Sequence, residues 1–403
     1  MIVFADIQMM NISEYIRLMH KAIVRSDHEK GNYQPDVNEW KLFLNGHVTT
    51  GDSLDYAYNK YRCRMKYFSL GKSIILNILC FFPWLFSLPL TLLSHRKNTK
   101  VTDLLVVEED IDVSYIDIFP DDFYSLYDNI TFEKNYNRYF GFLAKDFAEI
   151  YIRCIVQFPF KFYFLYIIYK EFLAHSYFIA KYNPSAVAVY VNERKIATPL
   201  ITEVYEQEGR KFISFMHGEY LLQLVQAYSC FSEYYVWDDM YIDMFKNDLR
   251  WKVGKYIVYK PKKLQKKWEL TNDNPDYDYT YYLCDANSEL IDDVTEAMNL
   301  LTKRGFKCKI RPHPREKEFN KYLIEKSGNV VIENIESTTL EESFRNTRFV
   351  VGLKSTSLYE AFAEGKPIVI DDVSSQQRYE GLKERKCRLL TMNHQLLSKV
   401  LSE

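Results

Sequence analysis

Residues 349–372 read Phe-Val-Val-Gly-Leu-Lys-Ser-Thr-Ser-Leu-Tyr-Glu-Ala-Phe-Ala-Glu-Gly-Lys-Pro-Ile-Val-Ile-Asp-Asp, and this stretch decides the predicted fold. The apolar run at 349–353 predicts a strand, and the polar residues at 355–357 are typical of a helix start. Gly365 is placed to end that helix, and a second apolar strand follows at 367–370. A strand, a helix and a second strand in this order predict a βαβ unit of a parallel sheet.

The turn before this helix is rich in hydrogen-bond donors, which are Lys354, Ser355, Thr356 and Ser357. In a parallel sheet such a turn lies at the carboxyl edge of the strands, where ligands bind. The N–H groups of the first helical turn have no partner inside the helix and favour an anion. Serine and threonine are also ordinary helix caps, so the turn alone does not identify a site.

A second motif lies upstream, where residues 306–317 read Phe-Lys-Cys-Lys-Ile-Arg-Pro-His-Pro-Arg-Glu-Lys. A short strand at 308–310 runs into Arg311 and then into His313, which lies between two prolines that stiffen the backbone. A phosphate between the two turns would contact Arg311, His313, Lys354 and the helix start together. The two motifs therefore predict an anion site.

The order of these motifs, Arg-Pro-His-Pro at 311–314 and then Gly-x-x-Ser-Thr-Ser-x-x-Glu-Ala at 352–361, resembles a known family pattern. It is similar to the carboxyl-terminal donor domain of GT-B glycosyltransferases of bacterial surface polysaccharide synthesis. The His-Pro and Ser/Thr motifs resemble those of bacterial sialyltransferases and polysialyltransferases. Capsule Kdo transferases and CDP-glycerol glycerophosphotransferases carry similar pairs. The resemblance covers the last third of the chain well and the middle loosely.

The resemblance implies an α/β fold of the GT-B type, with two Rossmann-like domains facing across a cleft and extra helices in the first. A charged, proline-marked segment at 260–263 is the best linker. We therefore expect an N-terminal acceptor-side domain at 1–260 and a donor domain at 261–403. The expected donor-binding residues are Arg311, His313, Pro314, Glu333, Lys354, Ser355, Thr356, Ser357 and Glu360.

Two strand ends in the first domain carry candidates for the catalytic base. A strand at 186–191 is followed by Glu193, and a strand at 211–215 is followed by His217 and Glu219. In the resembled families a strand of the first domain that ends in His-Gly faces the cleft, which places His217 and Glu219 near the acceptor. His217 is equally explained as a hydrogen-bonded turn histidine. Glu193 competes with Glu219 for the role of base.

The expected reaction moves a sugar from a CMP-sugar, such as sialic acid or Kdo, onto a hydroxyl of a bacterial surface glycan or lipid-linked oligosaccharide. The base would take the acceptor proton, and Arg311, His313 and the 355–357 turn would stabilise the departing phosphate. Inversion is expected by resemblance, and no metal or cofactor is called for. Two alternatives stay open: a CDP-glycerol or CDP-ribitol polyol-phosphate transferase, and a UDP-sugar-dependent GT-B enzyme or epimerase.

Composition narrows the class of protein. The chain has 403 residues, too many for one ordinary core, and its net charge of −2 argues against binding nucleic acid. Seven cysteines are scattered without a Cys-x-x-Cys pair, which disfavours a disulfide framework or a structural zinc and fits a reducing cytoplasm. The N-terminus has no basic segment followed by an apolar core, so we expect a cytoplasmic protein without a signal peptide.

An uncharged apolar stretch at 73–94 is the exception in a polar first third. Pro83 and Pro89 interrupt it, Lys72 precedes it, and 95–97 are basic. We expect a broken helix that dips into one leaflet at the inner face of the cytoplasmic membrane; the alternative is a buried core helix. A second apolar run at 152–180 predicts one long helix with a basic face, or a core helix. The acidic residues at 108–112 are interpreted as a solvated loop and not as a metal site.

Overall fold

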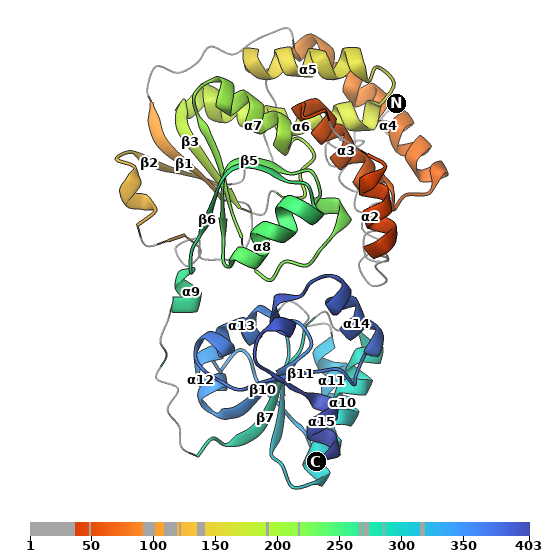
Figure 1. The fold of residues 1–403 in the computed structure, drawn as a ribbon, viewed down its shortest axis with the longest axis vertical. Helices are drawn as coiled ribbons and strands as arrows, with labels where there is room; N and C mark the ends of the chain where they lie inside the picture. Colours follow the sequence, from red (N-terminus) through yellow and green to blue (C-terminus); the bar gives the residue numbers. More distant parts are fainter. Residues whose placement is uncertain are drawn as a thin grey trace, which may run out of the picture. The chain divides into compact units, whose positions relative to one another are not determined.

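The computed structural model describes residues 37–47, 50–91, 101–108, 119–120, 122–134, 142–190, 193–216, 218–265, 268, 274–284, 287–314 and 319–403. The described chain forms two compact units. Unit 1 holds the described residues up to Tyr259 except Gly218–Leu221, which belong with Lys260–Glu403 in unit 2. Each unit has a six-stranded sheet with helices around it (Figure 1). This confirms the predicted α/β class with two Rossmann-like units.

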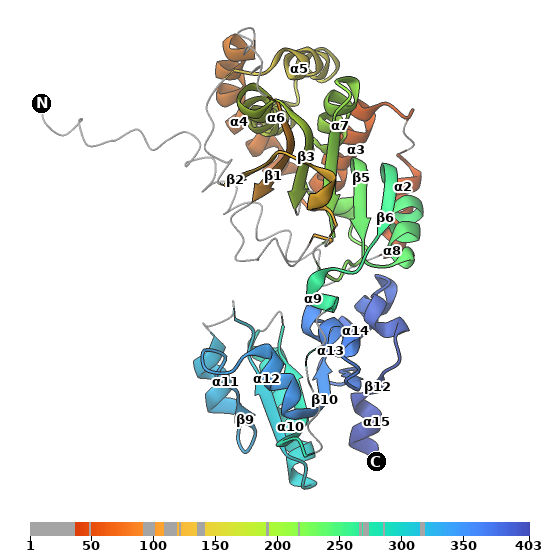
Figure 2. The same ribbon diagram turned by 90° about the vertical axis from the view of Figure 1, so that its left-hand side faces the viewer.

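The sheet of unit 1 has the order β2-β1-β3-β4-β5-β6, and its adjacent strands pair in parallel (Figure 2). Its strands are β1 Thr102–Glu108, β2 Ile130–Lys134, β3 Pro184–Tyr190, β4 Lys211–Phe215, β5 Cys230–Val236 and β6 Lys252–Val258. Val187 on β3 and Ile213 on β4 are fully buried. Such continuous apolar strands are typical of a parallel sheet covered on both faces.

The helices of unit 1 come mostly before β4. They are α2 Val37–Asn45, α3 Ser53–Met65, α4 Leu70–Thr91, α5 Lys145–Gln157, α6 Phe162–Tyr182, α7 Thr198–Gln207 and α8 Asp239–Asp243. Short 3-10 turns lie at Tyr124–Leu126 and Leu224–Gln226, and a π-turn at Met244–Asp248.

Two helix predictions for unit 1 were wrong. The first concerns α4, which is one helix through Pro83, whereas we expected a break there. A proline removes one backbone hydrogen bond, and the packing of α4 against α6 outweighs that loss. The second concerns the run at 152–180, which is two helices. Phe158 has φ −130° and ψ 52°, because the following Pro159 disfavours a helical conformation at the residue before it.

The sheet of unit 2 has the order β12-β11-β10-β7-β8-β9, again with parallel pairs. Its strands are β7 Tyr277–Tyr282, β8 Cys308–Arg311, β9 Val331–Ile332, β10 Thr347–Gly352, β11 Ile368–Ile370 and β12 Gln395–Leu396. Its helices are α9 Lys262–Gln265, α10 Ser288–Lys303, α11 Asn320–Lys326, α12 Leu340–Arg345, α13 Thr356–Ala363, α14 Gln376–Glu384 and α15 Leu397–Ser402, with a 3-10 turn at Arg388–Thr391.

The predicted βαβ unit at 349–372 is β10, α13 and β11. Gly365 follows α13 with φ +77°, a conformation that L side chains rarely adopt, and so ends the helix where the sequence predicted. Val351 and Val369, on the two paired strands, lie in the core of unit 2 together with Ile310 of β8. The strands that end in the two sequence motifs are therefore rigid elements of one core.

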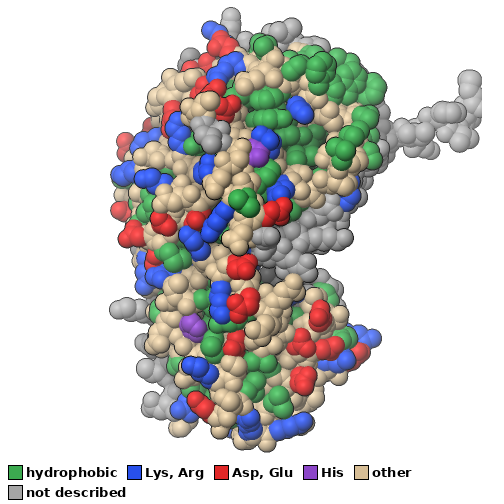
Figure 3. All heavy atoms as spheres, turned by 45° about the vertical axis from the view of Figure 1, so that its right-hand side comes forward, with side chains coloured by type: hydrophobic (Ala, Val, Ile, Leu, Met, Phe, Trp, Pro, Cys, Tyr) green, Lys and Arg blue, Asp and Glu red, His purple; other side chains and the backbone are tan. Residues whose placement is uncertain are grey.

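Side chains of α4 gather on an exposed apolar face of unit 1, visible in Figure 3 as a group of hydrophobic atoms. Among the described residues, no helix combines the length and the apolar composition that crossing a bilayer requires.

Candidate functional site

The two sequence motifs follow strands that flank the same neighbour. β8 and β10 both pair with β7, where Ile310 and Val351 are each aligned with Tyr281. Because all three strands are parallel, their carboxyl ends lie at one edge of the sheet. Strands with one strand between them are about 10 Å apart, twice the usual spacing. The turn that holds His313 and the start of α13 thus lie at the same edge of the sheet.

The start of α13 combines a cap with hydroxyl groups. Ser355 is the N-cap, and its side chain accepts a hydrogen bond from the N–H of Ser357 at 3.2 Å. One of the three predicted hydroxyls therefore serves the helix itself. Thr356 and Ser357 lie in the first turn, and the neighbouring Lys354 is half-buried. A helix N-terminus with hydroxyl and ammonium groups beside it is suited to an anion. Glu360, one turn further along α13, is also half-buried.

Gly352 allows this start to lie close to the sheet. A Cβ there would lie 3.2 Å from the carbonyl oxygen of Tyr282 and 3.0 Å from Cδ1 of Leu358. Both distances are tighter than ordinary carbon contacts, so a side chain would push α13 away from β7. The glycine of the motif is therefore explained by packing.

Arg311 and Glu333, two predicted donor-binding residues, are engaged with each other. Arg311 donates from Nη1 to Glu333 and from both terminal nitrogens to the carbonyl oxygen of Thr338 at 3.2 Å. Lys309 pairs with the other oxygen of the same carboxylate, and the three charged side chains are at most 10% exposed. This cluster of two cations and one carboxylate carries a net positive charge, which favours an anion nearby.

His313 and Pro314 follow this cluster and lie nearer the surface: His313 is half-buried and Pro314 is exposed. Arg311 is thus buried, whereas His313 is partly exposed to solvent.

The segment Gly218–Leu221 brings a carboxylate into unit 2. Glu219 accepts a hydrogen bond at Oε1 from the backbone N–H of Arg388, at 2.6 Å. A Cβ on Gly218 would lie 3.4 Å from Oγ1 of Thr356, so this segment lies beside the start of α13. Burial raises the pKa of the Cys387 thiol, and the negative charge of Glu219 and a hydrogen bond to it raise it further. His217, the other candidate in this motif, lies outside the described residues.

Glu193, the competing base, is part of the core of unit 1. It is 1% exposed, and its Oε1 accepts a hydrogen bond from the hydroxyl of Tyr234 at 2.8 Å. Its backbone carbonyl accepts from Nζ of Lys60 at 2.6 Å and from the hydroxyl of Ser229 at 2.9 Å. A carboxylate this deeply buried is poorly placed to receive a proton from an acceptor, so we favour Glu219.

Lys60 itself was not singled out from the sequence. It is 1% exposed and also donates to the carbonyls of Gln226 and Ala227. It lies three residues after Ala57 and one before Tyr61, both buried, so it falls on the inward stripe of α3. A charged residue on an apolar stripe is the signal that would have identified it.

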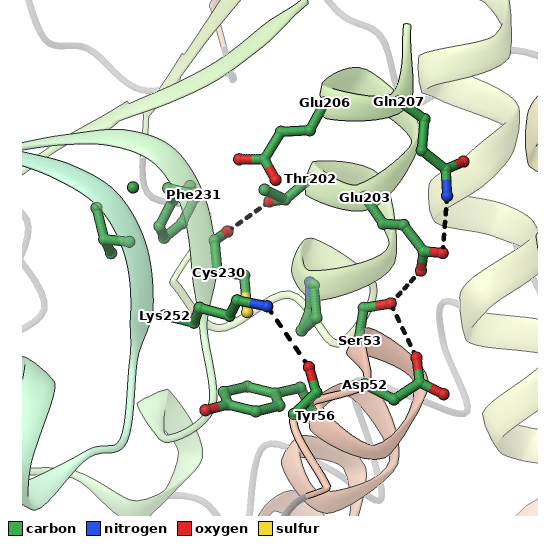
Figure 4. A pocket seen from close by; sticks show the side chains of 14 residues that line it. Asp52, Ser53, Tyr56, Thr202, Glu203, Glu206, Gln207, Cys230, Phe231 and Lys252 are labelled. Carbon is green, nitrogen blue, oxygen red and sulfur yellow. Dashed lines mark hydrogen bonds between the residues drawn. The ribbon is translucent and has the colours of Figure 1, made fainter. Parts of the chain in front are cut away.

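A cavity of about 440 Å³ in unit 1 was also not predicted (Figure 4). It is lined by residues of α3, α7 and the first residues of β5 and β6, including Asp52, Glu203, Thr202, Cys230 and Lys252. It thus lies at the amino-terminal edge of its sheet, opposite to the edge where ligands of parallel sheets bind. Asp52 and Glu203 both pair with Arg153, at 3.2 and 2.7 Å, which joins α3, α5 and α7. These charges have a structural role.

Among the described residues, no group of three or more histidine, cysteine, aspartate or glutamate side chains is arranged to hold a metal ion.

No protein-family model matches this sequence, and no curated protein is similar to it. Comparison with solved structures finds loose likenesses. A UDP-GlcNAc 2-epimerase from Neisseria meningitidis bound to UDP-GlcNAc aligns with 75% of this chain and 90% of its own, at 12% identity and a TM-score of 0.42. The wall teichoic acid polymerase TagF soaked with CDPG aligns with 86% and 88%, at 12% identity and a TM-score of 0.40.

Other matches are partial. A chain of the GtfA/B complex aligns with 47% of this chain at 12% identity and a TM-score of 0.30, and the match spans 42% of that chain. The match to TarM spans 46% of that chain. This chain therefore spans less than half the length of these two proteins. Likenesses at such identities and TM-scores do not transfer an activity or a substrate.

Proposed function

We propose that this protein is a glycosyltransferase that moves a sugar from a nucleotide-linked donor, a CMP-sugar by the resemblance of its motifs, onto a hydroxyl of a surface glycan. The observation that supports the proposal is that three predicted segments belong to unit 2. His313 and the start of α13 follow strands of one sheet at the same edge, and Gly218, the residue before Glu219, lies beside Thr356.

The donor phosphate would lie at the start of α13, where the first N–H groups, Thr356, Ser357 and Lys354 can donate to it. His313 would donate from the neighbouring turn. The N–H donors are fixed by the backbone of α13, so they need no rearrangement when charge develops on the phosphate. The buried pair of cations at Lys309 and Arg311 adds a positive field at the same edge.

In the proposed reaction the acceptor oxygen attacks the anomeric carbon while the bond from that carbon to the phosphate oxygen breaks. The electron pair leaves with the phosphate as CMP. Glu219 takes the acceptor proton. A carboxylate has two oxygens, so the bond from Arg388 N–H does not use all of its accepting capacity.

The acceptor is a glycan hydroxyl, and a lipid-linked glycan at the inner face of the cytoplasmic membrane is the acceptor we favour.

Thermal stabilisation of the full chain by CMP, CDP, UDP and GDP at equal concentration tests the donor, because a ligand that binds the folded state more tightly raises the melting temperature more. We expect CMP or CDP to stabilise most. CMP-sialic acid, CMP-Kdo and CDP-glycerol are then incubated with acceptor glycans, and CMP release is measured. Release from CDP-glycerol alone would make the protein a polyol-phosphate transferase. Stabilisation by UDP alone, with turnover of free UDP-sugar, would make it an epimerase.

A further inference from the structure

One face of α4 is apolar and exposed along most of its length. Leu76 and Cys80 on the inner side are 3% and 2% exposed, and α4 packs there against α6. On the outer side Ile74, Ile78 and Phe82 are 50, 63 and 61% exposed. Their spacing of four residues places them in one row, which Leu85 continues. At 1.5 Å per residue the row is about 16 Å long.

The turn between α5 and α6 widens this face. The side chain of Asn77 donates to the carbonyl of Phe160 at 2.8 Å and accepts from the N–H of Tyr163 at 3.1 Å. These two bonds hold the turn against the middle of α4. Phe160 is 76% exposed there, and Val156, at the end of α5, is 75% exposed. The row on α4 and the turn thus form one surface (Figure 3), which we call the α4 face.

The two segments that form most of the α4 face carry only basic charges. Residues 70–91 and 158–170 contain three charged side chains, Lys72, Lys161 and Lys170, and no acidic one. Lys161 is exposed and directly follows Phe160.

We propose that the α4 face binds a bilayer that contains anionic lipid, with α4 lying in the plane of the interface. Soluble monomers rarely expose a contiguous apolar surface of this kind, so the face calls for an occupant. An apolar row flanked by lysines, in segments 70–91 and 158–170 that contain no acidic residue, matches acyl chains beneath anionic headgroups. This binding surface is distinct from the phosphate site in unit 2 and does not rest on the proposed function.

Binding of the α4 face to a bilayer is tested by co-sedimentation of the full chain with two kinds of vesicle. One contains phosphatidylcholine alone, and the other contains phosphatidylcholine mixed with phosphatidylglycerol. We expect binding to the mixed vesicles that weakens as salt is raised. The double variant Ile78→Ser with Phe82→Ser should bind at least about tenfold more weakly, because it removes exposed apolar area. The matched control replaces two exposed apolar residues of unit 2, Ile324→Ser and Val331→Ser, and should bind like the wild type.

Two further variants test the electrostatic contribution to membrane binding. Lys161→Glu should weaken binding to the mixed vesicles, whereas Lys321→Glu, at an exposed lysine of unit 2, should not. All variants should keep the wild-type circular dichroism and melting temperature, because the changed side chains are exposed. Unchanged sedimentation of the α4 variant, or no binding to mixed vesicles, would overturn the proposal. A wild-type dimer in gel filtration that the α4 variant converts to a monomer, without lipid binding, would overturn it in favour of a second copy.

Discussion

The carboxylate of Glu219 accepts a hydrogen bond from the backbone N–H of Arg388 at 2.6 Å, although 169 residues separate the two in the chain. This bond joins the segment Gly218–Leu221 to the turn that holds Arg388, and both belong to unit 2. Gly218, the residue before Glu219, lies beside the start of α13, which we assign to the donor phosphate. The position of Glu219 is therefore set by the same unit that would bind the nucleotide.

Glu219→Gln should abolish transfer and leave nucleotide binding intact. The amide oxygen can still accept from Arg388 N–H, so the local structure is kept, but the amide cannot take a proton. Loss of a general base costs about 10²–10⁴-fold in turnover. Glu193→Gln is the matched control: the amide keeps the hydrogen bond from Tyr234 and turnover should not change. The opposite pattern in a CMP-release assay would move the base to Glu193.

His313→Ala should weaken nucleotide binding and turnover together. A hydrogen bond to a charged phosphate contributes about 1.5–3 kcal/mol, which corresponds to roughly 10–150-fold in affinity. His394 in the same unit is a suitable control, because its ring bonds locally to the carbonyl of Met392 at 2.8 Å. Isothermal titration with the best nucleotide measures both variants. Wild-type affinity in His313→Ala would remove this histidine from the site.

Substitutions of Ser355 and Ser357 should have different effects, the first on the stability of the fold and the second on nucleotide binding. Ser355→Ala removes the N-cap of α13 and should lower the free energy of unfolding by about 1 kcal/mol. Ser357→Ala leaves that cap in place, because the cap bond uses the backbone N–H of residue 357. It should therefore weaken nucleotide binding with little change in the melting temperature. Equal affinity of Ser357→Ala and the wild type would show that this hydroxyl does not contact the phosphate.

Unit 1 should lose stability in mild acid through His175. Burial lowers the pKa of His175 to about 3, whereas its unfolded value is 6.5. Between these values the unfolded chain binds a proton that the folded chain does not, so stability falls as the pH drops below 6.5. At pH 5 the loss is about 2 kcal/mol relative to pH 7.5. Urea unfolding at both pH values measures it.

The control for this effect is His175→Gln, which keeps a polar group near the hydroxyl of Tyr205 but cannot titrate. Its unfolding free energy should change by about 2 kcal/mol less than that of the wild type between the two pH values. An identical pH dependence in both proteins would assign the acid sensitivity to other groups.

The parts of the fold that depend on neighbouring residues in the sequence could be predicted. The βαβ unit at 349–372 was found because its strand, cap and terminal glycine are contiguous in sequence. The helix break at Phe158 could also have been predicted, since Pro159 follows it directly. The continuity of α4 through Pro83 was not, because it depends on packing against α6.

The candidate site was predictable only in part, since its pairings join distant segments. Lys309 and Arg311 alternate along β8 and so share one side of the sheet, but their partner Glu333 follows a different strand. No local sequence pattern predicts that β9 pairs with β8. The bond between Glu219 and Arg388 likewise depends on the tertiary fold.

A crystal structure of the full chain with bound CDP tests the central claim most directly. We predict that a phosphate lies within hydrogen-bonding distance of the first N–H groups of α13 and of the imidazole of His313. Phosphates bound elsewhere, such as beside Lys252 in the cavity of unit 1, would contradict the assignment of the donor site to unit 2.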